Sequence, residues 1–509
     1  MKKTEWASPD EMANEIFDGA VIAFSGSGGG LQEADHIAAA IEKRFLATGH
    51  PHSLTLIHGV GIGDGMGSGI GRFAHQGMVK RVIGGHWTWS RPMQQLARDH
   101  AIEAYTFPAG VIQTLLREAG AGRHGLVTHI GLHTFADPRH GGGRCSDRTT
   151  EDLVEVIALG GKELLWYKPV KIDFALVRGT AGDPHGNITT REEAADMDAF
   201  AAALAAHNCG GKVYAQVRDR LDTAIVPARD VCVPGILVDK VCAYPEQQQT
   251  TGAPYDPSIS GQVAPPASLA APLLPEGIRY LIARRAAMEL EAGKCINFGF
   301  GIPDGIPLIA QAEGKEISWT VIEQGPHNGE LLSGHLFGAT RYPSAILSSN
   351  DQFDFFSGGG IDIAFLGMGE LDQFGNVNVS WLGEGVIGPG GFVDITQQAK
   401  KVVFCGTFEA KGLDVEATDG KVTIKRYGTV AKMVERVKHI TFSGARAQRE
   451  GQKVLYVTER AVFELTQDGL LLTDIPDGID LQKDVLDRMP FSVHVAEHLR
   501  TSPTAKHNG

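Results

Sequence analysis

Three segments of this 509-residue chain recur, in the same order, at a constant separation of 189 residues. A single short match of this kind is expected by chance, but three in one register over about 40 residues favour a duplicated domain over two unrelated α/β domains. A weaker match pairs residues 21–28 with residues 294–301 at a separation of 273, which implies extra segments in the first half. The three strong matches are residues 172–176 with 361–365, Gly186-Asn187 with Gly375-Asn376, and Lys212-Val213 with Lys401-Val402.

Apolar, β-branched runs alternate with Ala-rich amphipathic stretches in both halves. Strands that read as continuous apolar runs between helices predict mainly parallel sheets covered on both faces. We therefore expect two similar open α/β domains, residues 1–244 and 276–509, joined by a Pro-rich linker at 245–275. Strands are expected at 21–25, 54–58, 172–177, 212–216, 317–322, 361–365 and 401–405, and helices at 10–17, 37–45, 194–207 and 278–291.

Charge and composition exclude several classes of partner. The net charge of −13 would repel nucleic acid and anionic membrane surfaces. No stretch approaches the ~20 apolar residues of a membrane-spanning helix, and no apolar run of signal-peptide length follows the first residues. The six cysteines form no C-x-x-C pair. The sequence thus predicts a cytoplasmic protein with reduced thiols and no nucleic-acid or membrane partner.

Several common functional motifs are absent or incomplete. Two G-x-G-x-x-G patterns occur, but residues 383–388 run into Pro389-Gly390-Gly391 and residues 120–125 run into a strand, so neither opens a helix for a pyrophosphate. No G-x-S-x-G or P-loop motif is present. His494 and His498 lie four apart on a possible helix, but no third ligand accompanies them, so we predict no metal site.

The most informative segment is the apolar run 319–322, which ends in Glu323 and is followed by Gly325-Pro326. A residue at the carboxyl end of a strand in an open α/β sheet lies where such sheets bind their ligands. The carboxylate is either catalytic or a structural group that caps a loop or pairs with a basic side chain.

Three motifs together carry a family resemblance. Their order and approximate spacing resemble those of the class I coenzyme A transferases, in the single-chain form that joins alpha-type and beta-type halves. The propionate and acetoacetate-type acyl-CoA:carboxylate transferases are the most similar members. The motifs are Asn297-Phe298-Gly299-Phe300-Gly301-Ile302-Pro303, Glu323-Gln324-Gly325 and Gly388-Pro389-Gly390-Gly391-Phe392-Val393-Asp394, with further similarity at residues 26–29, 108–111, 131–138, 233–239 and 353–362.

The resemblance implies an enzyme of short-chain fatty acid and ketone-body metabolism, acting on acyl-CoA and small carboxylic acids. Glu323 would be its nucleophile, forming first an acyl-glutamyl anhydride and then a glutamyl-CoA thioester in ping-pong fashion. Backbone N–H groups of Gly388, Gly390 and Gly391 would stabilise the oxyanion, with Asn297 near the active site. No metal, nucleotide or prosthetic group is required, because coenzyme A is both substrate and covalent intermediate. Family members suggest a homodimer or homotetramer.

The sequence departs from the family pattern beside the expected acyl pocket. Ala109, followed by Gly110, stands where the family usually has Gln in a Pro-Gln-Gly turn, and the residues after the nucleophile include Gln324 and His327 instead of small ones. These four residues are our expected acyl-pocket residues, and the preferred acid stays open. Two alternatives also remain: an acyl-CoA hydrolase on the same scaffold, and a non-catalytic sensor of acyl-CoA or a phosphosugar.

Overall fold

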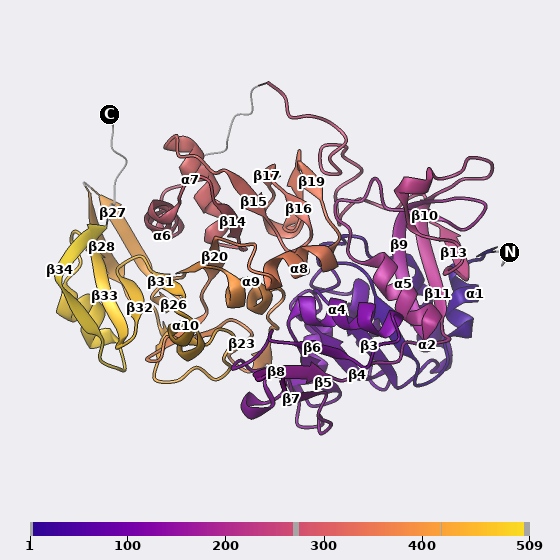
Figure 1. Ribbon diagram of the computed structural model, residues 1–509, viewed down its shortest axis with the longest axis horizontal. Coiled ribbons are helices and arrows are strands. Elements are labelled where there is room, and N and C mark those ends of the chain that lie inside the picture. Colours follow the sequence, from indigo (N-terminus) through magenta and orange to yellow (C-terminus); the bar gives the residue numbers. More distant parts are fainter. Residues whose placement is uncertain (1–3, 268–273, 419, 503–509) are drawn as a thin grey trace. The chain divides into compact units, whose positions relative to one another are not determined.

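The computed structural model describes residues 4–267, 274–418 and 420–502 (Figure 1). The chain forms two compact units, and two segments of its second half belong to the first unit. The predicted division at 1–244, 245–275 and 276–509 stays a prediction, and residues 268–273 of that linker lie outside the described residues. Unit 1 comprises Met1–Pro265, Glu323–Asp354 and Gly383–Asp394; unit 2 comprises Pro266–Ile322, Phe355–Leu382 and Ile395–Gly509.

The core of unit 1 is a parallel sheet with the strand order β1-β13-β11-β9-β2-β3-β4-β5 (Figure 1). Every residue of β9 is buried, as expected for a central strand covered on both faces. The strands are β1 (Glu5–Trp6), β13 (Lys240–Ala243), β11 (Lys212–Arg220), β9 (Phe174–Gly182), β2 (Val21–Phe24), β3 (Leu54–His58), β4 (Val79–Gly84) and β5 (Glu103–Thr106).

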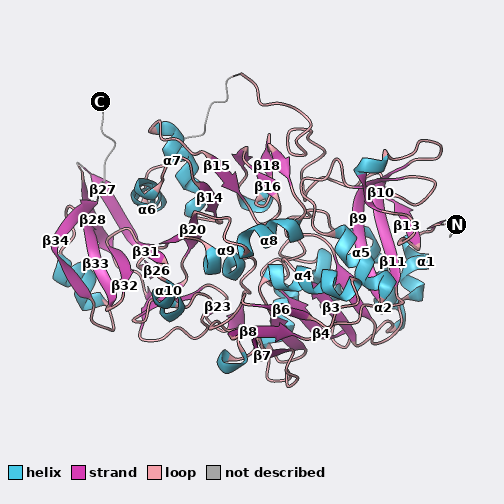
Figure 2. Ribbon diagram, in the orientation of Figure 1, coloured by secondary structure: helices cyan, strands magenta, loops and turns pink. Residues whose placement is uncertain are grey.

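Helices cover this sheet (Figure 2). Helix α4 (Ala109–Gly120) packs on α5 (Ala199–Asn208), and α5 packs on β9 and β11. Helices α1 (Pro9–Glu15) and α2 (Asp35–Thr48) pack on each other, and α3 (Arg91–Arg98) follows β4. The helix expected at 194–207 begins only at Ala199, because Asp198 has a left-handed φ of 60° and the carbonyl of Asp196 accepts from Ser349 N–H at 2.8 Å.

The extra length of the first half forms separate structure. Strands β6 (Leu126–Thr128), β7 (Val154–Leu159) and β8 (Lys162–Tyr167) make a small antiparallel sheet in the order β6-β8-β7. The second glycine motif therefore does enter a strand, as the sequence predicted. Strands β10 (Ile188–Thr189) and β12 (Val231–Val233) add an antiparallel edge beside β9.

Unit 2 repeats the central strand order of unit 1, read in the opposite direction. Its strands run β15-β14-β20-β25-β31-β32-β33-β34, parallel as far as β31 and antiparallel over β32 and β33, with β34 parallel to β33. His494 and His498 lie on strand β34, so the helix considered for them is wrong. The strands are β14 (Cys295–Phe298), β15 (Trp319–Val321), β20 (Ile363–Gly367), β25 (Lys401–Cys405), β31 (Lys453–Val457), β32 (Val462–Thr466), β33 (Gly469–Pro476) and β34 (His494–Ser502).

Equivalent hydrogen bonds confirm the duplication. Lys212 is in register with Phe174 on β9, and Lys401 is in register with Ile363 on β20, which preserves the 189-residue separation. Asp183 and Asp372 each accept from the backbone and side-chain N–H groups of the asparagine four residues later, at 3.0 Å.

The weaker match needs a shift of one residue. Val21 N–H donates to Asp173, and Cys295 N–H donates to Asp362, each at 2.9 Å, so these strands are 274 residues apart and not 273. The glycines that follow the two strands do match at 273, which means that the second half has one residue fewer between strand and turn.

The remaining helices of unit 2 are short. The helix expected at 278–291 ends as α6 at Ala286 and continues as a 3-10 turn, Ala287–Glu289; α7 spans Ile306–Ala312 and α10 spans Gly444–Glu450. No helix within the described residues is long and apolar enough to cross a membrane. All six cysteines are free thiols.

Candidate active site

Glu323 occupies the second position after strand β15, at the start of a tight turn. Gly325 has a φ of 107°, and a Cβ atom there would lie 2.1 Å from the carbonyl oxygen of Leu347, so the turn accepts only glycine. Leu347 N–H donates to the Gly325 carbonyl at 3.0 Å, and β16 (Pro326–His327) pairs with β19 (Ala345–Ile346). These contacts fix the direction in which the chain leaves Glu323.

The Glu323 carboxylate is held by two donors. Gly391 N–H donates to Oε2 at 2.8 Å, and Gln324 Nε2 donates to Oε1 at 3.1 Å. Behind Glu323, Ser349 Oγ donates to Gln113 Oε1 at 2.7 Å and lies 3.4 Å from the Glu323 carbonyl oxygen. The side chain is therefore oriented at both oxygens, and its backbone is supported by helices α4 and α8 (Ser349–Ser357).

The glycine loop, residues 388–391, lies against the end of β4 and the start of α4. Gly390 N–H donates to the Gly85 carbonyl at 2.8 Å, and Ala109 N–H donates to the Gly390 carbonyl at 2.9 Å. A Cβ atom at Gly391 would lie 2.2 Å from Glu323 Oε2, closer than real Cβ contacts occur. The loop thus needs glycine at 391 to approach the carboxylate.

Most of the residues expected at the site do gather near Glu323. Gly391 and Gln324 contact its carboxylate, and Ala109 and Gly110 border the glycine loop. Ala109 is fully buried, so its role in an acyl pocket stays a prediction. Oxyanion stabilisation by the glycine loop also stays a prediction. Gly390 N–H already donates to the Gly85 carbonyl, and a Cβ atom at Gly388 would lie 2.5 Å from the same carbonyl oxygen.

Two of the expected site residues, His327 and Asn297, hydrogen-bond to groups other than the Glu323 carboxylate. His327 Nε2 lies 2.7 Å from Gln352 Oε1 of α8. Asn297, in unit 2, donates from Nδ2 to the Val321 carbonyl at 2.9 Å and so supports the strand that leads to Glu323. The contribution of these two residues to the reaction stays a prediction.

Sequence reasoning missed two aromatic residues: His86, which borders the glycine loop, and Trp89, which lies beside His86 at Gly61. A Cβ atom at Gly390 would lie 3.8 Å from both carboxylate oxygens of Glu323 and equally far from His86 Cδ2. The Trp89 indole fills the space beside Gly28 and Gly61, where a Cβ atom would come within 2.5 Å of the ring. The signal was the Gly84-Gly85 pair directly after an apolar strand, a turn that lets backbone and ligand approach closely.

Burial dominates the electrostatics around the Glu323 carboxylate. It raises the pKa of Glu323 to about 7, against the hydrogen bonds from Gly391 and Gln324, which lower it. Burial, with a smaller effect from His58, lowers the pKa of His86 to about 4, so this imidazole is neutral at physiological pH. Glu323 therefore titrates near neutrality.

We expect kcat/KM to depend on the ionised form of Glu323. The rate should level off above about pH 7 and fall about tenfold per unit at lower pH, because only the carboxylate attacks. Replacing Gln324 by Leu removes a donor that stabilises the anion. The acid limb of the profile, where kcat/KM falls, should therefore move to higher pH. Profiles of kcat/KM from pH 5 to 9 check both statements; a limb that moves to lower pH in the variant would contradict them.

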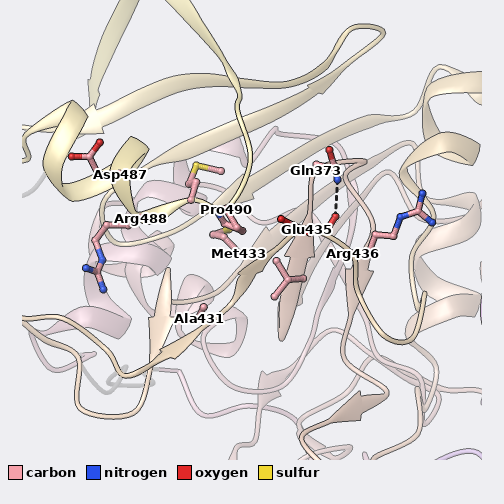
Figure 3. Close-up of a pocket in the computed structure, with 10 residues that line it drawn as sticks. Gln373, Ala431, Met433, Glu435, Arg436, Asp487, Arg488 and Pro490 are labelled. Atoms are coloured by element: carbon pink, nitrogen blue, oxygen red, sulfur yellow. Dashed lines mark hydrogen bonds between the residues drawn. The ribbon is translucent and has the colours of Figure 1, made fainter.

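Two other features of the described residues lie outside this site. Asp18, His50 and His52 form an exposed group whose ligand atoms lie within 4.8 Å of one another. A pocket of about 760 Å³ in unit 2 contains none of the expected site residues; within it Gln373 Nε2 donates to the Glu435 carbonyl at 3.0 Å (Figure 3). Its lining includes Ala431, Met433, Val434, Arg436, Asp487, Arg488, Met489 and Pro490.

A glutamate at a strand end, held by a glycine loop on a duplicated α/β fold, is the arrangement expected of an acyl-transferring enzyme with a carboxylate nucleophile. A family model described as coenzyme A transferase matches residues 7–243. The chain belongs to the class I coenzyme A transferase family, in its single-chain form, and is an enzyme that transfers CoA.

Curated relatives and a solved structure support this over nearly the whole chain. Acetate CoA-transferase YdiF of Escherichia coli K12 is 41% identical, covering 97% of this chain and 93% of its own. Caffeate CoA-transferase of Acetobacterium woodii is also 41% identical, covering 97% and 96%. A crystal structure of acyl-CoA transferase YdiF from E. coli O157:H7, a thioester complex with CoA, superposes with a TM-score of 0.92 at 39% identity, covering 98% and 95%.

Proposed function

We propose that this enzyme transfers CoA from an acyl-CoA to a free carboxylic acid by a ping-pong mechanism in which Glu323 carries first the acyl group and then CoA. The observation that carries the proposal is the Glu323 carboxylate itself, partly buried and held by Gly391 N–H at 2.8 Å and Gln324 Nε2 at 3.1 Å. A carboxylate is a poor nucleophile in water, so orientation and desolvation at this position supply the needed activation.

The first half-reaction has two steps. A Glu323 oxygen attacks the thioester carbonyl, the C–S bond breaks, and an acyl-glutamyl anhydride and CoA thiolate result. The thiolate then attacks the glutamyl carbonyl and releases the original acid, which leaves with one oxygen from Glu323, while CoA stays on the side chain as a thioester. The incoming acid reverses these steps, so the thioester energy is conserved and no further cofactor is needed.

Gly391 is positioned to assist the attack on the glutamyl carbonyl. Its N–H already donates to Oε2 of Glu323, and negative charge develops on this oxygen when it becomes the oxyanion of the tetrahedral intermediate. One such donor is worth roughly 3–4 kcal/mol in related acyl transfers. For the first oxyanion, on the thioester carbonyl, we propose Gly388 N–H as the donor, because Pro389 has no N–H and Gly390 N–H donates to the Gly85 carbonyl.

The substrates we propose are acyl-CoA donors and small carboxylic acids. Relatives named for acetate and for caffeate are equally similar to this chain, so overall similarity does not select the acid. We further propose a homodimer or homotetramer in the cytoplasm that uses no metal. Light scattering on the purified protein tests the assembly, and activity should be unchanged by a chelator.

Two measurements test the mechanism. Initial rates with donor and acceptor varied together should give parallel lines, and intersecting lines would contradict a covalent CoA intermediate. With an acceptor acid labelled with ¹⁸O, label should pass to Glu323 and then into the released acid over successive turnovers. An acyl-CoA hydrolase would instead release CoA at an undiminished rate when no acceptor carboxylate is present.

Changing Ala109 to Gln should alter the relative kcat/KM among acceptor acids. Gln adds a donor and an acceptor where Ala offers neither, which favours acids with a polar substituent and leaves less room for apolar ones. Because Ala109 is fully buried, the larger side chain should also lower the thermal midpoint. A panel of acids assayed against Ala109→Ser as a smaller control checks this, and an unchanged ranking would remove position 109 from specificity.

A further inference from the structure

A second carboxyl group, that of Asp394, is buried close to Glu323 and has no part in the mechanism above. Asp394 is only 1% exposed. A Cβ atom at Gly110 would lie 2.5 Å from Asp394 Oδ1 and 2.7 Å from Phe353, and a Cβ atom at Gly391 would lie 2.2 Å from Glu323 Oε2 and 2.9 Å from the same ring. The Phe353 ring therefore lies beside both carboxyl groups.

Asp394 joins the glycine loop to helix α4. The N-cap residue of this helix, Pro108, makes no side-chain cap, so the first N–H groups need other acceptors. Ala109 N–H donates to the Gly390 carbonyl at 2.9 Å, and Gly110 N–H donates to Asp394 Oδ2 at 3.3 Å. Residues 390–394 thus complete the start of α4, and the same residues carry the Gly391 N–H that holds Glu323.

The two carboxyl groups compete for one negative charge. Two donors from other residues hold Glu323, at 2.8 and 3.1 Å, whereas Asp394 accepts a longer bond of 3.3 Å from Gly110 and a weaker one from its own backbone N–H. Burial, and then the nearby charge of Glu323, raise the pKa of Asp394 well above its usual range. The other titratable groups facing the pair are the Tyr167 hydroxyl, which donates to the Ile130 carbonyl, and the neutral His86. The proton of the pair therefore belongs on Asp394.

We propose that Asp394 is a positioning residue for the nucleophile: as a neutral carboxyl group it fastens the glycine loop to the first turn of α4 and leaves the negative charge on Glu323. This inference rests on the proposed role of Glu323. A displacement of about 1 Å in a catalytic group can cost about 100-fold in rate, so a loop that is no longer fastened should slow the covalent step.

Two substitutions separate the hydrogen bond from the charge. Asp394→Asn has nearly the shape of the protonated acid, keeps an acceptor for Gly110 N–H and cannot ionise. Asp394→Ala removes the acceptor. We expect Asp394→Asn to form the CoA thioester within about threefold of the wild-type rate, and Asp394→Ala to be about 10- to 100-fold slower with KM for acyl-CoA little changed.

The pH profile gives a readout that loss of stability alone would not produce. If Asp394 is neutral, the acid limb of kcat/KM in Asp394→Asn stays at the wild-type pH. If Asp394 were ionised, removing its charge would let Glu323 ionise more easily and would move the limb to lower pH. Asp183→Asn is the matched control, because Asp183 is another fully buried acceptor of backbone N–H groups, at 2.8 and 3.0 Å, outside the site.

Single-turnover mixing with acyl-CoA, followed by intact-protein mass spectrometry, measures the covalent step directly. Asparagine as slow as alanine, a shifted limb, or alanine as fast as wild type would each overturn the proposal. Absence of any CoA adduct on the wild-type enzyme would instead overturn the proposed role of Glu323. Each rate is divided by the concentration of folded enzyme. A loss of stability that an Asp394 variant shares with Asp183→Asn therefore does not produce the predicted difference in rate.

Discussion

Replacing Glu323 by Gln should reduce CoA exchange by several orders of magnitude while leaving binding of acyl-CoA largely intact. The amide has nearly the same volume and still accepts from Gly391 N–H through its oxygen, but it lacks the anionic oxygen that we propose attacks the thioester. The comparison therefore isolates the chemical step. Exchange assays on freshly purified variant, checked by mass for deamidation back to Glu, measure the effect.

The wild-type enzyme should show the intermediate itself. Incubated with acyl-CoA and no acceptor, it should gain the mass of CoA less one water on the peptide that contains Glu323, because the second acid is needed to complete turnover. The Glu323→Gln enzyme should gain none. Substantial exchange by the pure variant, or an adduct on another peptide, would contradict the assignment of the nucleophile.

The same substitution has a distinctive effect on stability. The folded-state pKa of Glu323, about 7, lies above its ordinary value of 4.5, so ionising this group destabilises the fold as pH rises from 4.5 through 7. Gln carries no such cost. The variant should therefore melt at a higher temperature than wild type at pH 8 and at the same temperature near pH 4.5, which excludes misfolding as the cause of lost activity.

The repeated architecture was readable from the sequence because it is local. Apolar runs such as those at β3 and β25 appear within a few residues of the structural bounds, and the 189-residue separation holds in the register of β9 with β11 and of β20 with β25. The start of α5 was misplaced because one left-handed residue, Asp198, breaks a pattern whose composition still favours helix.

The surroundings of Glu323 depend on contacts between segments distant in the sequence. Gly391 lies 68 residues after Glu323, and Asp394 lies 284 residues after its partner Gly110. Helical and strand periodicity report only which face of an element is buried, and not which distant segment covers it. Motif resemblance supplied Glu323 as the candidate nucleophile, and the glycine loop with Asp394, whereas the places of His86 and Trp89 and the contact of Asp394 with α4 needed the packed structure.

Gly391→Ala should be nearly as damaging as loss of the nucleophile, although it removes no functional group. The new methyl would lie 2.2 Å from Glu323 Oε2 and 2.9 Å from Phe353, so the carboxylate must move away from the N–H that holds it. We expect kcat to fall about 10²- to 10³-fold, the range for loss of one preorganised oxyanion donor. Gly67→Ala is the control, because a Cβ atom at Gly67 has nothing within 4 Å.

Rates of thioester formation and thermal midpoints, measured for Gly391→Ala and Gly67→Ala, test this expectation. A Gly391→Ala enzyme within threefold of wild type would show that the glycine loop tolerates a side chain and does not position Glu323. Equal loss in Gly67→Ala would point to a general sensitivity of the fold. A large loss confined to Gly391→Ala, with both midpoints near that of wild type, is the result that the 2.8 Å contact between Gly391 N–H and Glu323 requires.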